Sequence, residues 1–232
     1  MPASLTRAWA LSVCWITIVL AEPIAHGLPD GFVDVQQAIP TIKIDLRYFS
    51  AHNFVGERIN GYQAPRAILT QPAAKALERV QQELALFGLG LKLFDAYRPQ
   101  QAVEHFVRWA RDVNDTRMKA AFYPDVAKLD LFKEGYIAEK SSHSRGSTVD
   151  LTLAPLNALD DATELDMGTP FDWFGPESWP DSAAVTPSQR AHRLLLRTLM
   201  EKHGFQPYAQ EWWHFTLAME PFPDTYFDFP VQ

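Results

Sequence analysis

The chain has 232 residues, a length that fits one domain, or one domain with a short targeting segment. Hydrophobic residues make up 47% of it and aromatic residues 12%, enough to bury a core, so wholesale disorder is not expected. The net charge of −7 argues against nucleic-acid binding through a basic surface, and a single cysteine excludes a disulfide framework and a cysteine-rich zinc finger.

The first 21 residues are predicted to form a cleaved secretory signal peptide. One basic residue, Arg7, precedes an uncharged stretch from Ala8 to Ala21, and small residues lie near its end. This stretch is shorter than the roughly 20 residues that span a bilayer, which disfavours the alternative of an uncleaved membrane anchor. Cleavage before Glu22 would release residues 22–232 as a periplasmic or secreted protein without a membrane span.

Strands and helices are predicted to follow one another irregularly along the rest of the chain. Helices are indicated where apolar residues recur at three and four positions, and strands where they alternate. Because the order is not a strict βαβ repeat, we expect an α+β fold, with one compact domain and a largely antiparallel sheet flanked by helices. In chain order, the predicted elements are strand 41–46, helix 70–88, strand 89–95, helix 99–112, strand 149–153, a long loop 154–187, helix 186–204 and strand 213–217.

Each predicted helix carries one apolar stripe, which is expected to face the core rather than a cofactor. The last helix begins with a capping box formed by Thr186 and Gln189, and Pro187 is its first helical residue. The stripes are Leu77, Val80, Leu84 and Phe87 in the first helix, Val103, Phe106, Val107 and Ala110 in the second, and Leu194, Leu195, Thr198 and Leu199 in the third.

Two short segments contain residue types that bind zinc. The first holds His143 and Asp150, and the second holds His214. Two histidines and one carboxylate are a common ligand set for catalytic zinc, with the fourth position left for water. The chain must turn back between His143 and Asp150, because seven extended residues span roughly 23 Å whereas metal–ligand bonds are about 2 Å. The polar segment from Ser144 to Ser147 has the composition of such a turn.

Glu211 is predicted to act as a general base rather than as a metal ligand. Residues three apart, such as Glu211 and His214, share a face of a helix but point to opposite faces of a strand. We therefore expect Glu211 in a turn, with a strand beginning at about Trp213, so that its carboxylate reaches the water rather than the metal. Any one of these side chains alone could be ordinary solvated or core structure, and the hypothesis depends on the set.

A second polar cluster stands where a predicted strand meets a predicted helix. Asp95 ends the strand and Arg98 directly precedes the helix. The pair could form a salt bridge that only stabilises this corner. Alternatively, Asp95 could orient the guanidinium of Arg98 toward a carbonyl oxygen under attack, where it would stabilise the developing oxyanion. The sequence by itself favours neither interpretation.

These motifs resemble those of the zinc D-alanyl-D-alanine dipeptidases, the group that includes the vancomycin-resistance dipeptidase. The resemblance extends from about Phe32 to the C-terminal end and implies a compact α+β domain shared with zinc DD-carboxypeptidases and the hedgehog signalling domain. The matching motifs are D-x-Y-R-P at 95–99, S-S-H-S-R-G-S-x-x-D-L-T-L at 141–153, M-G-T-x-F-D at 167–172 and E-W-W-H at 211–214.

The resemblance implies that residues 22–232 form a catalytic domain that binds one zinc ion and hydrolyses the dipeptide D-alanyl-D-alanine. It places Asp172, with Tyr48 near it, where the substrate ammonium would bind, and Ser141 where the carboxylate would be held. Nucleic acid is not an expected partner, and the oligomeric state is left open. The residues implied in metal binding and catalysis are His143, Asp150 and His214 as ligands, Glu211 as base, Arg98 as transition-state stabiliser and Asp95 as its support.

Two other functions would use the same metal set. A zinc D,D-carboxypeptidase that trims peptidoglycan stem peptides needs a cleft open on the N-terminal side of the scissile bond, whereas the carboxylate of Asp172 and the long loop favour a dipeptidase. A zinc-stabilised binding module would need neither Glu211 nor Arg98. An exported dipeptidase would act on dipeptide released outside the membrane, in cell-wall turnover or scavenging, rather than on the cytosolic pool.

Overall fold

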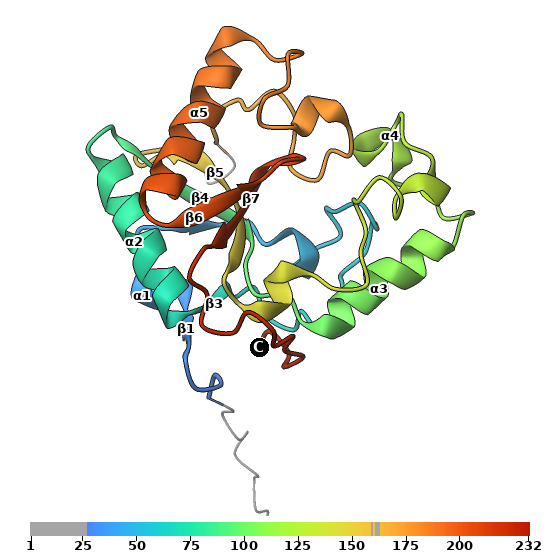
Figure 1. Ribbon diagram of the computed structural model, residues 1–232, viewed down its shortest axis with the longest axis horizontal. Coiled ribbons are helices and arrows are strands. Elements are labelled where there is room, and N and C mark those ends of the chain that lie inside the picture. Colours follow the sequence, from blue (N-terminus) through green and yellow to red (C-terminus); the bar gives the residue numbers. More distant parts are fainter. Residues whose placement is uncertain (1–26, 159, 161–162) are drawn as a thin grey trace, which may run out of the picture.

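A five-stranded sheet runs through the middle of the computed structural model, which describes residues 27–158, 160 and 163–232 (Figure 1). The strand order is β2-β4-β5-β7-β6, with β2 parallel to β4 and the other pairs antiparallel. The predicted α+β fold with a largely antiparallel sheet is thereby confirmed. The strands are β2 (Lys43–Ile44), β4 (Leu89–Asp95), β5 (Thr148–Pro155), β6 (Phe205–Tyr208) and β7 (Glu211–Leu217).

Helices flank this sheet on two sides. In Figure 1, α2 (Gln71–Ala85) and α5 (Pro187–Lys202) lie on one side of the strands, whereas α3 (Gln100–Arg111) and α4 (Lys119–Phe122) lie on the other. α2 contacts β4, and α5 contacts β6 and α2. The remaining elements are a small antiparallel sheet of β1 (Phe32–Asp34) and β3 (Ile68–Thr70), the short helix α1 (Val35–Ala38), and the 3-10 turns η1 (Arg47–Phe49), η2 (Lys128–Asp130), η3 (Ser142–Arg145) and η4 (Pro176–Ser178).

The three long helices confirm their predicted positions, but two of the predicted stripes need correction. All four stripe residues of α3 are buried. On α2, by contrast, Phe87 is 62% exposed because the helix ends before it.

The capping box predicted at the start of α5 is present, with the side chains of Thr186 and Gln189 each hydrogen-bonded to the backbone of the other residue. On α5, Leu194 is 61% exposed and Thr198 is also exposed, because the run of three leucines allows several helical faces. The face that is buried comprises Arg193, Leu196, Leu199 and Met200.

The strand predictions succeeded where the apolar run is long. β4 has the predicted bounds, and β5 begins one residue before the predicted start. By contrast, only Lys43 and Ile44 of the predicted strand 41–46 join the sheet. The edge strand β6 was not predicted, because Pro207 interrupts its pattern and proline is tolerated in sheets chiefly at edges.

The predicted signal peptide, residues 1–21, lies outside the described residues. Among the residues that the structure does describe, none of the helices combines the length and the apolar character that crossing a bilayer requires.

Candidate metal centre

Three neighbouring strands place Asp95, Asp150 and His214 side by side. In the register of the sheet, Asp95 of β4 pairs with Asp150 of β5, and Asp150 pairs with His214 of β7. Side chains of directly paired residues project to the same face of a sheet. The sheet therefore brings a predicted metal ligand from β5 next to one from β7, although the two are far apart in the sequence.

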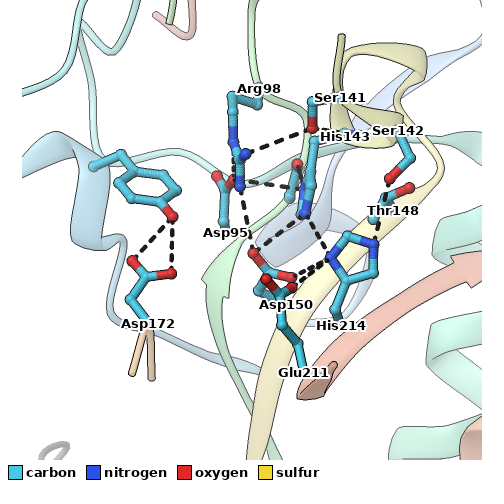
Figure 2. Close-up of polar contacts among 12 residues, drawn as sticks. Asp95, Arg98, Ser141, Ser142, His143, Thr148, Asp150, Asp172, Glu211 and His214 are labelled. Carbon is cyan, nitrogen blue, oxygen red and sulfur yellow. Dashed lines mark hydrogen bonds and ion pairs between the residues drawn. The ribbon is translucent and has the colours of Figure 1, made fainter. Parts of the chain in front are cut away.

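His143 reaches the same place from the turn that precedes β5. It lies in η3, where Ser141 accepts a hydrogen bond from the His143 backbone N–H and Gly146 ends the turn with a φ of 80°. The chain thus turns back between His143 and Asp150 as predicted. The Nδ1 atom of His143 lies 2.7 Å from the carbonyl oxygen of Ala96, so its Nε2 atom faces Asp150 and His214 (Figure 2).

The spacing of the three donor atoms suits a tetrahedral metal ion. His143 Nε2 lies 3.2 Å from Asp150 Oδ2 and 3.3 Å from His214 Nδ1, and His214 Nδ1 lies 3.1 Å from Asp150 Oδ1. Bonds of about 2.1 Å at tetrahedral angles would separate the ligand atoms by about 3.4 Å. Asp150 Oδ1 is buried and, although His214 Nδ1 lies 3.1 Å away, it accepts no hydrogen bond of suitable geometry; a bound cation would give it a partner. The three residues therefore fit zinc.

The electrostatics of two candidate ligands, His143 and Asp150, suit metal binding. Burial lowers the pKa of His143, which keeps this imidazole neutral near pH 7. Burial by itself would raise the pKa of Asp150, but His143 and His214 outweigh it and lower that pKa, so the carboxylate stays ionised. Neutral imidazole and ionised carboxylate are the forms that coordinate a metal. Burial lowers the pKa of His214, but Asp150 and Glu211 outweigh it and raise that pKa, so this imidazole must give up its proton when it binds a metal.

Glu211 lies within β7 and not in a turn before it, which corrects the prediction. The pairing of β6 with β7 is irregular beside Tyr208, the partner of Glu211. The two residues that follow Glu211, Trp212 and Trp213, are both buried. The irregularity re-aims the side chains, and Glu211 Oε2 lies 3.4 Å from His214 Nδ1 instead of on the opposite face.

The surroundings of Glu211 suit a general base. Burial, helped by the charge of Asp150 and opposed by His214 and Arg98, raises the pKa of Glu211 to about 7. A base is most effective when its pKa lies near the working pH, because it is then both unprotonated and able to hold the proton it takes. The carboxylate lies beside one predicted ligand, His214, which is where a proton from an attacking water would be taken.

Arg98 is held beside the predicted ligands. Its guanidinium lies 2.9 Å from Asp95 Oδ2 and 3.5 Å from Asp150 Oδ2, and its Cζ atom lies 4.9 Å from the centre of the Tyr48 ring. The other oxygen of Asp95 accepts a hydrogen bond of 2.6 Å from Tyr62. The salt bridge at the corner therefore exists, and the same contact aims Arg98 toward the metal ligands (Figure 2). Tyr62 was missed by sequence reasoning, because no local motif marks it.

The predicted substrate contacts line a cavity of about 500 Å³, which the predicted metal ligands line as well. Both carboxylate oxygens of Asp172 accept hydrogen bonds from the Tyr48 hydroxyl, at 3.0 and 3.1 Å. Burial, and next the charge of Asp150, raise the pKa of Asp172 well above its ordinary value. Ser141 Oγ lies 3.5 Å from a terminal nitrogen of Arg98. The structure thus brings the predicted site residues to one cavity, except Asp95, which contacts Arg98 without lining the cavity itself.

The sequence is similar to known dipeptidases over most of its length. The family model described as "D-ala-D-ala dipeptidase" (Peptidase_M15) matches residues 29–232. The D-alanyl-D-alanine dipeptidase of Streptomyces coelicolor is 43% identical over 86% of this chain and 98% of its own. That of Enterococcus faecalis is 40% identical over 88% of this chain and 100% of its own. A solved structure of a point mutant of the vancomycin-resistance D,D-pentapeptidase VanY, in complex with Zn(II), covers 68% of this chain and 76% of its own at 13% identity and a TM-score of 0.39.

Proposed function

The chain belongs to the D-alanyl-D-alanine dipeptidase family of the M15 peptidases, and from this premise we propose that it is a zinc enzyme that hydrolyses D-alanyl-D-alanine to two D-alanines. The observation that carries the proposal is the meeting of His143, Asp150, His214 and Glu211 at one cavity. Residues 22–232 are proposed as the catalytic domain. A binding module that needs zinc only for stability would have no use for the buried base.

The roles of the catalytic side chains follow from where they lie. Zinc held by the three ligands would supply Lewis-acid activation of the water and the scissile carbonyl. Glu211 takes one proton from the attacking water and returns it to the amine of the leaving D-alanine, so the carboxylate is regenerated. Arg98, fixed by Asp95, donates hydrogen bonds to the oxygen that becomes negative as the carbonyl is attacked.

The two ends of a dipeptide can be recognised by different groups in the cavity. Asp172, with Tyr48 on its carboxylate, is the proposed partner of the free ammonium. Ser141, next to Arg98, is proposed to bind the carboxylate together with backbone donors. Such an arrangement favours a dipeptidase over a carboxypeptidase, because a substrate with an acylated amine would place a neutral amide against a buried carboxylate.

Blocking the substrate amine should therefore abolish most of the activity. With zinc-loaded enzyme, we expect release of D-alanine from D-Ala-D-Ala, and at least about 100-fold lower kcat/KM for N-acetyl-D-Ala-D-Ala, because the acetylated amine offers no ammonium to pair with the Asp172 carboxylate. Free D-alanine is quantified for both substrates, with a chelator-treated sample as the blank. Equal or faster cleavage of the acetylated dipeptide would favour the D,D-carboxypeptidase instead.

Replacing Arg98 with lysine distinguishes its two interpretations. Lysine can keep an ion pair with Asp95, but it lacks the planar fork that reaches two groups at once. If Arg98 stabilises the transition state, kcat should fall by about 10²- to 10³-fold while the melting temperature changes little. A variant with near-normal kcat and a lowered melting temperature would reduce Arg98 to a structural role at the corner.

We propose that the enzyme is exported, with residues 1–21 as a cleaved signal peptide. Export would place the activity on dipeptide outside the cytoplasm, in cell-wall turnover or scavenging. Residues 1–27 fused to a reporter that is active only after export should yield activity, and the mature protein should begin near Glu22 by N-terminal sequencing. An inactive reporter would indicate that the enzyme stays in the cytosol. An active reporter with an uncleaved N-terminus would indicate a membrane anchor.

A further inference from the structure

The segment from Met167 to Trp179, which carries Asp172, is attached to α5 by one buried arginine. Arg193 is 3% exposed and lies on the buried face of the helix. Its Nε donates to the carbonyl of Met167 at 2.6 Å, and its Nη1 donates to the carbonyls of Glu177 at 2.9 Å and Trp179 at 2.8 Å. One side chain thus holds both ends of the segment.

The chemistry of this contact favours an arginine. Burial lowers the pKa of Arg193 to about 10, so the guanidinium is still charged at neutral pH. A buried charge is costly unless it is hydrogen-bonded, and three carbonyls accept protons from Nε and Nη1 of Arg193, while Nη2 is buried without a hydrogen-bond partner. A lysine ammonium carries the same charge on one nitrogen, and it cannot reach carbonyls at both ends of the segment together.

Asp172 depends on such an attachment because its backbone is strained. It has a φ of 62°, in the left-handed region, which costs free energy for a residue with a side chain, although aspartate tolerates it better than most. This conformation turns its carboxylate toward the Tyr48 hydroxyl and into the cavity. Release of the segment would let the backbone relax and move the carboxylate away.

A second contact ties the same segment to the strand that carries the base. The indole nitrogen of Trp212 donates to Thr169 Oγ1 at 2.9 Å, and Trp212 directly follows Glu211 in β7. The guanidinium of Arg193 also lies 5.9 Å from the centre of the Trp212 ring. Arg193 and Trp212 therefore connect the element that carries Asp172 with the one that carries Glu211.

We propose that Arg193 is a positioning residue for substrate-amine recognition: by fixing the segment from Met167 to Trp179, it holds the Asp172 carboxylate where the substrate ammonium binds. This inference rests on the proposed function, because it presupposes that Asp172 binds the ammonium. It adds that the specificity for a free amine depends on a side chain outside the cavity, contributed by α5.

The variant Arg193→Lys tests the proposal with D-Ala-D-Ala as substrate. We expect its KM to rise about tenfold, with kcat within about threefold of wild type and zinc content unchanged, because small displacements of a substrate-binding group weaken binding strongly. Arg197→Lys is the matched control, since Arg197 lies one turn further along α5 in partly exposed ion pairs with Asp181 and Glu201. Its KM should equal that of wild type.

A double-mutant cycle separates positioning from general stability. In an Asp172→Asn background, Arg193→Lys should change KM by less than about twofold, because the group it positions no longer binds the ammonium. An equally large effect in both backgrounds would show that Arg193 acts only on the fold, and would overturn the proposal.

A milder variant covers the case in which Arg193→Lys does not fold. Thr169→Val removes the hydroxyl that accepts from Trp212 without disturbing a buried charge, and should also raise KM, by a smaller factor. A wild-type KM in folded Arg193→Lys, or in Thr169→Val where Arg193→Lys does not fold, would refute the positioning role while leaving the dipeptidase intact. Wild-type enzyme that releases no D-alanine would refute the proposed function itself.

Discussion

Glutamine in place of Glu211 should lower kcat for D-Ala-D-Ala hydrolysis by about 10²- to 10⁴-fold, while the enzyme still binds one zinc ion. The amide keeps the shape of the side chain but cannot accept a proton from water. Zinc binding should persist because His143, Asp150 and His214 fit a tetrahedral ion without Glu211. Zinc content and single-turnover rates measured on the same preparation test both parts.

The control for Glu211→Gln is Glu134→Gln, which makes the same change at an exposed glutamate outside the metal centre. Its kcat should match that of wild type. An active Glu211→Gln enzyme with normal zinc would show that another group takes the proton. Loss of zinc along with activity would instead make Glu211 part of the metal site.

Removal of the metal should reduce hydrolysis to the uncatalysed level, an effect at least as large as the loss of the base. In wild type, activity should return when zinc is added back to chelator-treated enzyme. In His143→Ala it should not return, because only two of the three donors that surround the proposed zinc position are left. Zinc content and D-alanine release are measured before and after zinc is restored.

Thermal melting provides a second readout of the same experiment. A ligand that binds only the folded state raises the melting temperature, so zinc should stabilise wild type and have a much smaller effect on His143→Ala. Another divalent ion that restored both activity and melting temperature as well as zinc would leave the site intact but change the assigned metal. Full activity after complete chelation would refute a metallopeptidase.

The three-strand register explains why the centre can be rigid. Asp95, Asp150 and His214 stand on adjacent strands of a sheet whose other face is covered by α2 and α5. A catalytic constellation mounted on strands is held more tightly than one on loops. Two of the site residues that come from turns or loops, His143 and Asp172, are each held by a separate hydrogen bond, with the Ala96 carbonyl and with the Tyr48 hydroxyl respectively.

Sequence patterns determined the long elements and pointed to the candidate metal ligands. β4 and the helices α2 and α3 repeat apolar residues over enough positions for the period to be unambiguous, and their positions were predicted closely. The ligands were recognisable because few residue types bind zinc, and His143, Asp150 and His214 stand in short, distinctive motifs.

Only the tertiary structure decided how these residues face one another. The irregular pairing of β6 with β7 puts Glu211 on the side of His214, against the alternation that its sequence spacing predicts. Two further contacts could not be predicted from the sequence: the hydrogen bond from the Tyr62 hydroxyl to Asp95, and the hydrogen bonds from Arg193 to the segment that carries Asp172. Local periodicity reports which residues are buried, but a contact between distant segments is fixed by how the elements pack, and no short-range pattern encodes it.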